Sequence, residues 1–177
     1  HAKAGDRDPN TWPNDDKRPL TPDGVEEQLQ AAKVMKRMGI RFDFLVTSPM
    51  LRARQSAEAV AEAYRWPEEP QVTEALGHGY SVAAVVKLLT KFPPDSRVAL
   101  VGHEPDLSRL AAALISSGGS TRIGLKKSGV VGIEFEGGGE EKTKILHPTE
   151  ERTEQPEEAV SRKAPQEIQN KDFPKRP

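Results

Sequence analysis

Apolar and polar positions along the chain follow two different periods, and these periods predict helices alternating with short strands. Two short segments, residues 42–48 and 97–103, are built around apolar runs (FLV at 44–46 and VALV at 98–101) and have the pattern of buried strands. In four other stretches apolar residues recur every three or four positions, as in helices packed on a core. These predicted helices cover residues 20–40, 50–66, 81–92 and 105–117. The resulting order of elements indicates an α/β fold.

Several residue types mark where these elements end. Thr21 and Pro22 are suited to the start of the first helix, as the N-cap and the first helical residue, and Gly39 is suited to its end. Residues 129–137 and 142–146 alternate apolar with polar positions around a glycine-rich segment, which predicts a hairpin. Residues 1–19 and 67–80 lack periodicity and are expected to be irregular. With a hairpin added to the α/β order, the sheet should be mixed.

The composition changes near the end of the chain. Residues 148–177 combine charged residues and prolines with almost no large apolar residues, which predicts a disordered tail. A docking motif in this segment is a weaker alternative. The 177 residues thus divide into one domain, residues 1–147, and a tail, residues 148–177.

Charge and cysteine content exclude several classes of function. The formal net charge is −1, so nothing favours binding to nucleic acid or to an anionic membrane. The chain has no cysteine, which excludes disulfides, thiolate metal sites and a cysteine nucleophile. No apolar run approaches the roughly 20 residues that span a bilayer. We expect a soluble, cytoplasmic monomer.

Chemistry is suggested by two junctions between a strand and a helix. Arg52 follows the first apolar run and His103 follows the second, each close to the start of a predicted helix. The free N–H groups at helix starts attract anions, and arginine offers a rigid fork of donors that suits phosphate. Taken singly, Arg52 fits a surface salt bridge and His103 fits a hydrogen-bonded turn. Together they indicate a phosphoryl site.

Four motifs in register carry a resemblance to a known family. They are HAKA at 1–4, RPLTPDG at 18–24, SPMLRARQSAE at 48–58 and VGHEPDL at 101–107. In this order and spacing they resemble the histidine phosphatase superfamily, also called phosphoglycerate mutase-like, and most of all its phosphohistidine phosphatase branch, SixA. The resemblance spans residues 1–147. It implies a three-layer α/β/α sandwich around a mostly parallel sheet.

The resemblance also implies roles for particular residues. His1 matches the histidine that becomes phosphorylated, and Arg52 and His103 match residues that contact the phosphoryl group. Arg18 either contacts the surroundings of the phosphate or fixes a loop through a salt bridge. The family places an arginine immediately before its nucleophilic histidine, at the end of a first strand. The sequence contains neither, so we expect it to be incomplete at its N-terminus.

The proton donor is less well defined by the sequence. Glu74 lies near the position at which the superfamily carries an acid, but it fits a solvated loop carboxylate equally well. Asp6 and Asp16 in the first loop are alternatives. Ser48 precedes a proline and a helix, so we interpret it as an N-cap and not as a nucleophile.

The substrate is inferred from the length of one segment. Residues 66–80 are too few for a large cap domain, and an open rim suits a phosphorylated protein side chain. We therefore expect a phosphohistidine phosphatase that acts through phosphorylated His1, with Arg52, His103 and Arg18 at the phosphate and Glu74 as candidate acid. The alternatives are a phosphomonoesterase for a small metabolite and a non-catalytic phosphate- or phosphoprotein-binding module. No metal or other cofactor is expected, because His1, His78, His103 and His147 lack metal-site spacing.

Overall fold

The computed structural model describes residues 1–116, 121–135 and 143–146. Its centre is a parallel sheet with the strand order β2-β1-β3. Strand β1 (Phe44–Thr47) lies in the middle and pairs with β2 (Gln71–Val72) on one side and β3 (Val98–Val101) on the other. Adjacent parallel strands end at the same edge, so β1 and β3 deliver the residues that follow them to one place.

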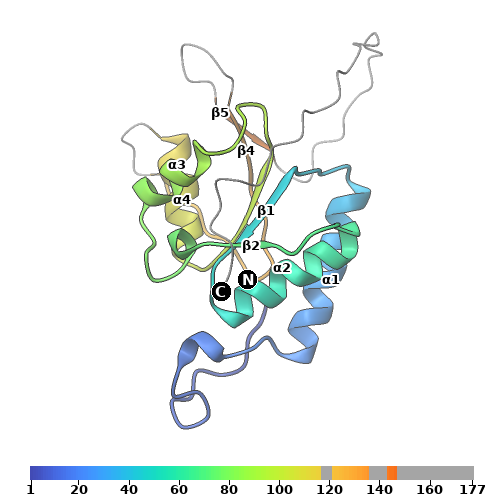
Figure 1. Cartoon of the computed structure of the whole chain (residues 1–177), viewed down its shortest axis with the longest axis vertical. Coiled ribbons are helices and arrows are strands. Elements are labelled where there is room, and N and C mark those ends of the chain that lie inside the picture. Colours follow the sequence, from blue (N-terminus) through green and yellow to red (C-terminus); the bar gives the residue numbers. More distant parts are fainter. Residues whose placement is uncertain (117–120, 136–142, 147–177) are drawn as a thin grey trace.

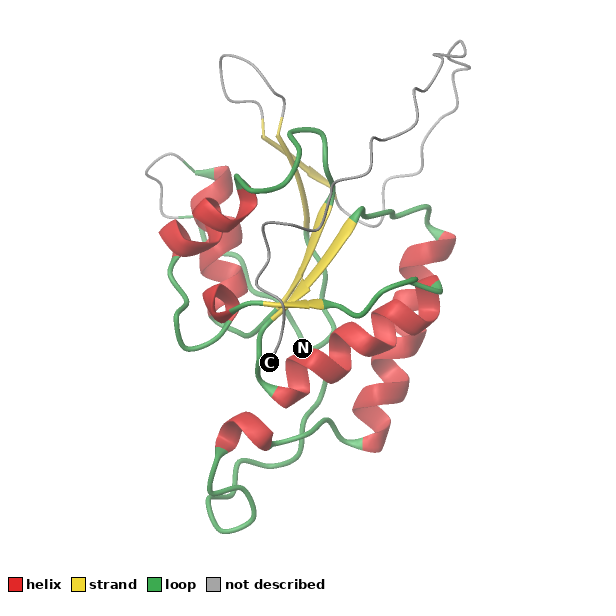
Figure 2. Cartoon of the chain, in the orientation of Figure 1, coloured by secondary structure: helices red, strands yellow, loops and turns green. Residues whose placement is uncertain are grey.

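Helices cover both faces of this sheet (Figure 1). Helices α1 (Pro22–Arg37) and α2 (Leu51–Tyr64) lie on one face, and α3 (Val82–Leu89) and α4 (Asp106–Ile115) lie on the other. Figure 2 shows the strands between these two helical layers. The expected three-layer α/β/α sandwich with a mostly parallel sheet is confirmed.

A hairpin and two short helical turns complete the described structure. Strands β4 (Gly132–Phe135) and β5 (Thr143–Leu146) form a separate antiparallel pair, as their alternating pattern predicted. The 3₁₀ helices η1 (Asp15–Lys17) and η2 (Glu74–Leu76) lie in the two segments that were expected to be irregular.

Two neighbouring residues of β1 enter two separate cores, because successive side chains of a strand point to opposite faces. Leu45 packs with Ala32 and Val60, from α1 and α2. Val46 packs with apolar residues of the other layer, among them Val85 and Leu110. Leu45 and Val46 are 2% and 1% exposed, so β1 is buried on both faces.

The first helix begins as its sequence predicted and also holds the start of the chain. The Thr21 hydroxyl accepts a hydrogen bond from the Gly24 N–H (3.0 Å), and Gly39 adopts a φ of +75° beyond the helix end. A Cβ on Gly24 would lie 2.1 Å from the Lys3 carbonyl oxygen. Only glycine therefore allows residues 1–5 to pass this close to α1.

Two sequence predictions are corrected by the structure. Residues 67–80 are not wholly irregular, since they contain β2, a strand of two residues that is too short to produce a periodic pattern. Ser48 is not an N-cap: α2 begins at Leu51, and Met50 occupies the cap position without a side-chain hydrogen bond. The predicted tail, residues 148–177, and His147 lie outside the described residues.

None of the helices in the described residues has the length and apolar character needed to cross a membrane.

Candidate active site

Two histidines meet at the carboxyl end of the central sheet. His103 lies two residues after the end of β3, and the backbone nitrogen of His1 donates a hydrogen bond to the carbonyl of the intervening Gly102 (2.8 Å). The two rings pack edge to face, with their centroids 5.1 Å apart. The structure thus brings together the two histidines that the sequence singled out, which are about a hundred positions apart in the chain.

The His1 ring is held in one tautomer by its neighbour. Its Nδ1 lies 2.7 Å from the Ala2 carbonyl oxygen. A carbonyl only accepts hydrogen bonds, so Nδ1 carries a proton, and in the neutral ring Nε2 keeps a free lone pair. The Ala2 N–H donates to the Ser56 hydroxyl (3.1 Å), which in turn donates to the Arg52 carbonyl (2.7 Å). These bonds fix the segment carrying His1 to α2.

The His103 ring is buried and held by a serine. Its Nε2 lies 2.8 Å from the Ser48 hydroxyl, at the end of β1. Burial, followed by nearby positive charges such as that of Arg52, lowers the pKa of His103 to about 3, so the ring is neutral near pH 7. Its Nδ1 is buried without a hydrogen-bond partner among the described residues. Ser48, interpreted from sequence as a cap, therefore orients His103.

The guanidinium of Arg52 is buried in the first turn of α2, with 5% of the residue exposed. It donates to the Asp15 carbonyl oxygen (2.7 Å) and lies 3.2 Å from the Asp15 carboxylate. Its Nε is buried and has no partner in the described part of the chain. Among the side chains that the structure describes, this N–H and the His103 Nδ1 are the buried nitrogens without a hydrogen-bond partner, and both are available to a ligand.

Asp15 connects the first loop to three arginines. Its carboxylate lies 2.7 Å from Arg18 Nε and 3.4 Å from Arg7, in addition to its contact with Arg52. The hydrogen bond from Arg18 is the main cause that lowers the pKa of Asp15 to about 2. Arg18 also donates to the Gly5 carbonyl (2.8 Å). Arg18 thus makes the loop-fixing salt bridge that was one of its two interpretations, and its contact with phosphate stays a prediction.

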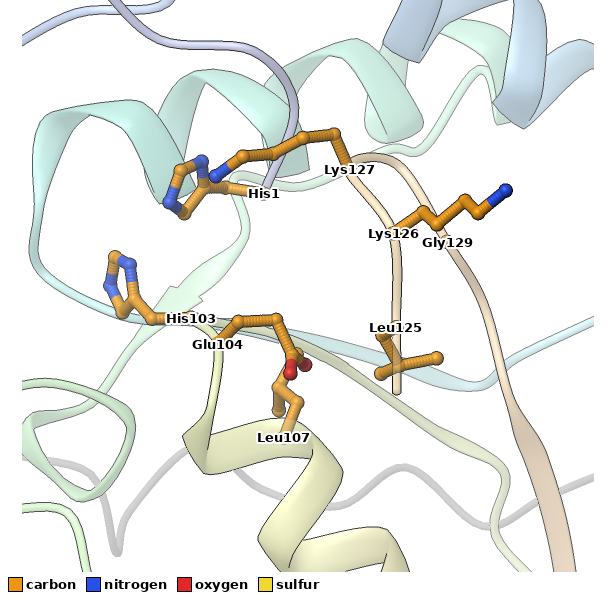
Figure 3. Close-up of a pocket in the computed structure, with 8 residues that line it drawn as sticks. All are labelled: His1, His103, Glu104, Leu107, Leu125, Lys126, Lys127 and Gly129. Atoms are coloured by element: carbon orange, nitrogen blue, oxygen red, sulfur yellow. The ribbon is translucent and has the colours of Figure 1, made fainter. Parts of the chain in front are cut away.

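A cavity of about 130 Å³ opens beside the histidine pair (Figure 3). Its wall combines the two histidines, the start of α4 and a turn before β4. The lining residues are His1, His103, Glu104, Leu107, Leu125, Lys126, Lys127 and Gly129. Arg52 and Arg18 are not among them, but the charge of Arg52 adds to the effect of burial in lowering the pKa of both His103 and Lys127.

The acids proposed from the sequence lie elsewhere. Glu74 is exposed on η2 and does not line the cavity. Asp6 is exposed, and Asp16 pairs with the exposed His78 at 2.9 Å. The carboxylate that lines the cavity belongs to Glu104, which accepts a hydrogen bond from Ser108 (2.5 Å). The role of Glu74 as an acid stays a prediction.

Three contributors to the site were missed by reasoning from the sequence. Glu104 was hidden within the motif that supplies His103, and Asp15 is one of several acids in the first loop. Lys127 follows another lysine in an irregular segment, so no spacing marks it.

Metal binding finds no support in the described residues, where no group of three His, Asp or Glu side chains is placed to hold an ion.

Comparison with known proteins identifies the family. The family model described as histidine phosphatase superfamily (branch 1) matches residues 9–78. An uncharacterized protein of Picosynechococcus is 36% identical over 135 residues, which cover 75% of this chain and 80% of that protein. Phosphohistidine phosphatase SixA of Escherichia coli is 31% identical over 104 residues, covering 57% of this chain and 64% of SixA. The chain belongs to the histidine phosphatase superfamily.

The fold agrees with this membership in the histidine phosphatase superfamily. A structure of the protein histidine phosphatase SixA complexed with tungstate superimposes with a TM-score of 0.70, covering 84% of this chain and 93% of that one, at 23% identity. The family model supports a phosphatase, the enzyme class expected from the sequence. The segment matched by the family model contains Arg18, Arg52 and Glu74, whereas His1 and His103 lie outside it.

Proposed function

We propose that this protein is a phosphohistidine phosphatase that removes a phosphoryl group from a phosphorylated protein through a covalent intermediate on His1. The observation that carries the proposal is the 2.7 Å contact between His1 Nδ1 and the Ala2 carbonyl. In the neutral ring this contact puts the proton on Nδ1 and leaves Nε2 with a free lone pair, and only an imidazole nitrogen with a free lone pair is nucleophilic.

In the first step the lone pair of His1 Nε2 attacks phosphorus, and the bond from phosphorus to the substrate nitrogen breaks. The substrate imidazole takes a proton from water on its other nitrogen and then leaves as a neutral imidazole that keeps the electron pair of the broken bond. In the second step water attacks phosphorus, the bond to His1 breaks, and inorganic phosphate leaves. Water thus supplies one hydroxyl to phosphate and one proton to the product, and His1 returns to its neutral form.

Positive charge around the histidines supports this chemistry. A phosphoryl group in transfer spreads negative charge over three oxygens, so its transition state is stabilised by fixed donors. We assign this role to Arg52, whose Nε is buried without a described partner, and to His103, whose Nδ1 is likewise unpaired. Arg18 supports the same region through Asp15.

The size of the cavity favours a protein substrate over a small metabolite. Pockets that enclose small molecules usually measure about 300–1,000 Å³, and this cavity holds about 130 Å³. It can admit a phosphoryl group and the edge of an imidazole while the rest of the substrate stays outside. The phosphohistidine phosphatase SixA, 31% identical over its matched region, supports the same substrate class. We assign no step to Glu74, because a phosphohistidine leaving group does not require it.

We take residues 1–147 as the catalytic domain and propose that it acts as a monomer in the cytoplasm. The abrupt change in composition at about residue 148 supports this boundary, and the absence of cysteine suits a reducing compartment.

The test is to trap the phosphoenzyme. The protein is mixed with a phosphohistidine peptide, quenched in alkali and analysed by mass spectrometry, beside a His1→Ala variant whose fold is checked by circular dichroism. We expect phosphate on His1 that disappears on the time scale of turnover, and neither adduct nor turnover in the variant.

Matched phosphoserine peptides and a small phosphomonoester test the alternatives. Faster hydrolysis of the small phosphomonoester than of the phosphohistidine peptide would favour a metabolite phosphatase. Binding of the phosphopeptide without hydrolysis, by folded protein, would overturn the enzymatic proposal in favour of a binding module.

A further inference from the structure

The turn before β4 contributes two lysines to the cavity wall, Lys126 and Lys127. The Gly129 N–H donates to the Lys126 carbonyl (2.9 Å), which closes a four-residue turn with Lys127 and Ser128 at its corner. Ser128 has a φ of +55°, in the left-handed region that non-glycine residues rarely adopt. Such backbone geometry persists only where its surroundings enforce it, and it is often found at functional sites.

Helix α4 holds this turn in place. The Leu125 N–H donates to the Ser108 hydroxyl (3.2 Å), and Ser108 in turn donates to the Glu104 carboxylate (2.5 Å). Ser108 is 7% exposed. The residue that follows His103 is therefore connected through two hydrogen bonds to the turn that carries Lys127.

The two lysines of the turn point in different directions. The side chain of Lys127 extends toward His1, whereas that of Lys126 points away from both histidines (Figure 3). No carboxylate of the described residues lies within salt-bridge distance of Lys127, although Glu104 lines the same cavity. Lys127 also lies close enough to Arg52 and Arg18 for their charges, after burial, to lower its pKa.

We propose that Lys127 binds the phosphoryl group at the cavity mouth, and that the Ser108–Leu125 hydrogen bond positions it there. Like the proposed function, this assumes that the histidine pair faces a phosphoryl group. The turn is anchored and the ammonium is directed at His1, where it adds a donor from an element other than those carrying Arg52 and His103. An ammonium that has no salt-bridge partner among the described residues and is directed at the histidine pair is best suited to an anionic ligand.

Binding of inorganic phosphate to four proteins tests the proposal by isothermal titration calorimetry. In Lys127→Met the dissociation constant should rise by about tenfold or more, because a charge-assisted hydrogen bond is lost. Lys126→Met removes the same charge from the same turn and should cost no more than about threefold, since it lowers only the general positive potential. Lys127→Arg should bind within about threefold of the original protein, because it keeps the charge.

Ser108→Ala separates positioning from direct contact. This variant keeps Lys127 but releases the turn, so its phosphate affinity should fall less than that of Lys127→Met. In the double variant, the added Lys127→Met change should cost less affinity than it costs in the original protein. Thermal unfolding of each variant shows whether its fold is intact.

Equal phosphate affinity in folded Lys127→Met and the original protein would overturn the proposal. An equal loss of phosphate affinity in Lys126→Met and Lys127→Met would also overturn it. Failure of the original protein to bind phosphate would overturn it as well. Failure to hydrolyse a phosphohistidine peptide would instead count against the proposed function, and the comparison of the lysines by phosphate binding would still decide the role of Lys127.

Discussion

At the scale of single residues, the site depends on neighbours that fix the direction of each reactive group. The Ala2 carbonyl sets the tautomer of His1, and Ser48 holds His103. Asp15 holds both Arg52 and Arg18, and it does so as a charged carboxylate. The contact between the first loop and α2 therefore includes a charge pair, Asp15 with Arg52, beside the hydrogen bonds to backbone groups.

Asp15→Asn should remove a contribution to stability that depends on pH in a defined way. Hydrogen bonds from Arg18 and Arg7 and the charge of Arg52 lower the pKa of Asp15 from 3.8 to about 2 in the folded protein. Because the pKa of Asp15 is lower in the folded than in the unfolded protein, its charged form stabilises the fold at pH values above the unfolded pKa. This contribution to the free energy of unfolding should be complete above about pH 5 and should disappear as the pH falls from about 4 to 2.

Urea denaturation of the original protein and of Asp15→Asn, at several pH values, measures this difference. The gap between their free energies of unfolding should be constant near neutral pH and should narrow in acid. A gap of the same size at every pH would show that the charge of Asp15 does not contribute.

At the scale of elements, the first helix and the segment that precedes it form one unit. Thr21 caps α1, and its own backbone N–H donates to the Lys3 carbonyl (3.0 Å). Lys3 passes over Gly24, where no side chain fits. The element that carries His1 is therefore positioned by the start of α1 as well as by Ser56.

Gly24→Ala should destabilise the protein and reduce its activity together. The new Cβ would lie 2.1 Å from the Lys3 carbonyl oxygen, so the backbone of residues 1–5 has to move, at a cost of about 1–3 kcal/mol. Denaturation and turnover of a phosphohistidine peptide measure the two effects. Glu27→Ala, at an exposed position of the same helix, is the control and should change neither. Normal stability and activity of Gly24→Ala would show that the segment is less constrained than the contact implies.

Elements were predicted better than the details of the site. Thr21 and Gly39 mark α1 in the sequence because capping and a positive φ are local requirements. The strand β2 was missed because its two residues, Gln71 and Val72, are too few to show the alternation of apolar and polar positions that marks a strand. Val72 is also 51% exposed, so it does not mark a buried position. Lys127 could not be found, because its place beside His1 depends on a turn anchored by Ser108, which is a tertiary contact.

At the scale of the whole molecule, two cores share one strand. Leu45 belongs to the core under α1 and α2, and Val46 to the core under α3 and α4. The fold class was predictable because the apolar run at residues 44–46 is continuous, as in strands buried on both faces. The residues that contact each other across the sheet were not predictable from one sequence.

Leu45→Ala should destabilise the whole described domain and not only one layer. Leu45 is 2% exposed, and truncating a buried leucine costs about 2–5 kcal/mol. Because the strand is shared, circular dichroism and tryptophan fluorescence should report the same, lower urea midpoint. Val34→Ala, at a position 42% exposed on α1, is the control and should have a much smaller effect. Separate transitions for the two probes would show that the layers unfold independently.

The place of β1 between the two cores also has a consequence for how the length of this protein can change. Side chains along a strand alternate between faces, so one inserted residue within β1 would send Leu45 and Val46 into the opposite layers. The same insertion would move Ser48 out of reach of His103. An insertion in the turn at residues 93–96, between α3 and β3, would disturb neither relation. Natural length variation among relatives should therefore avoid residues 44–48 and be found in such connecting turns.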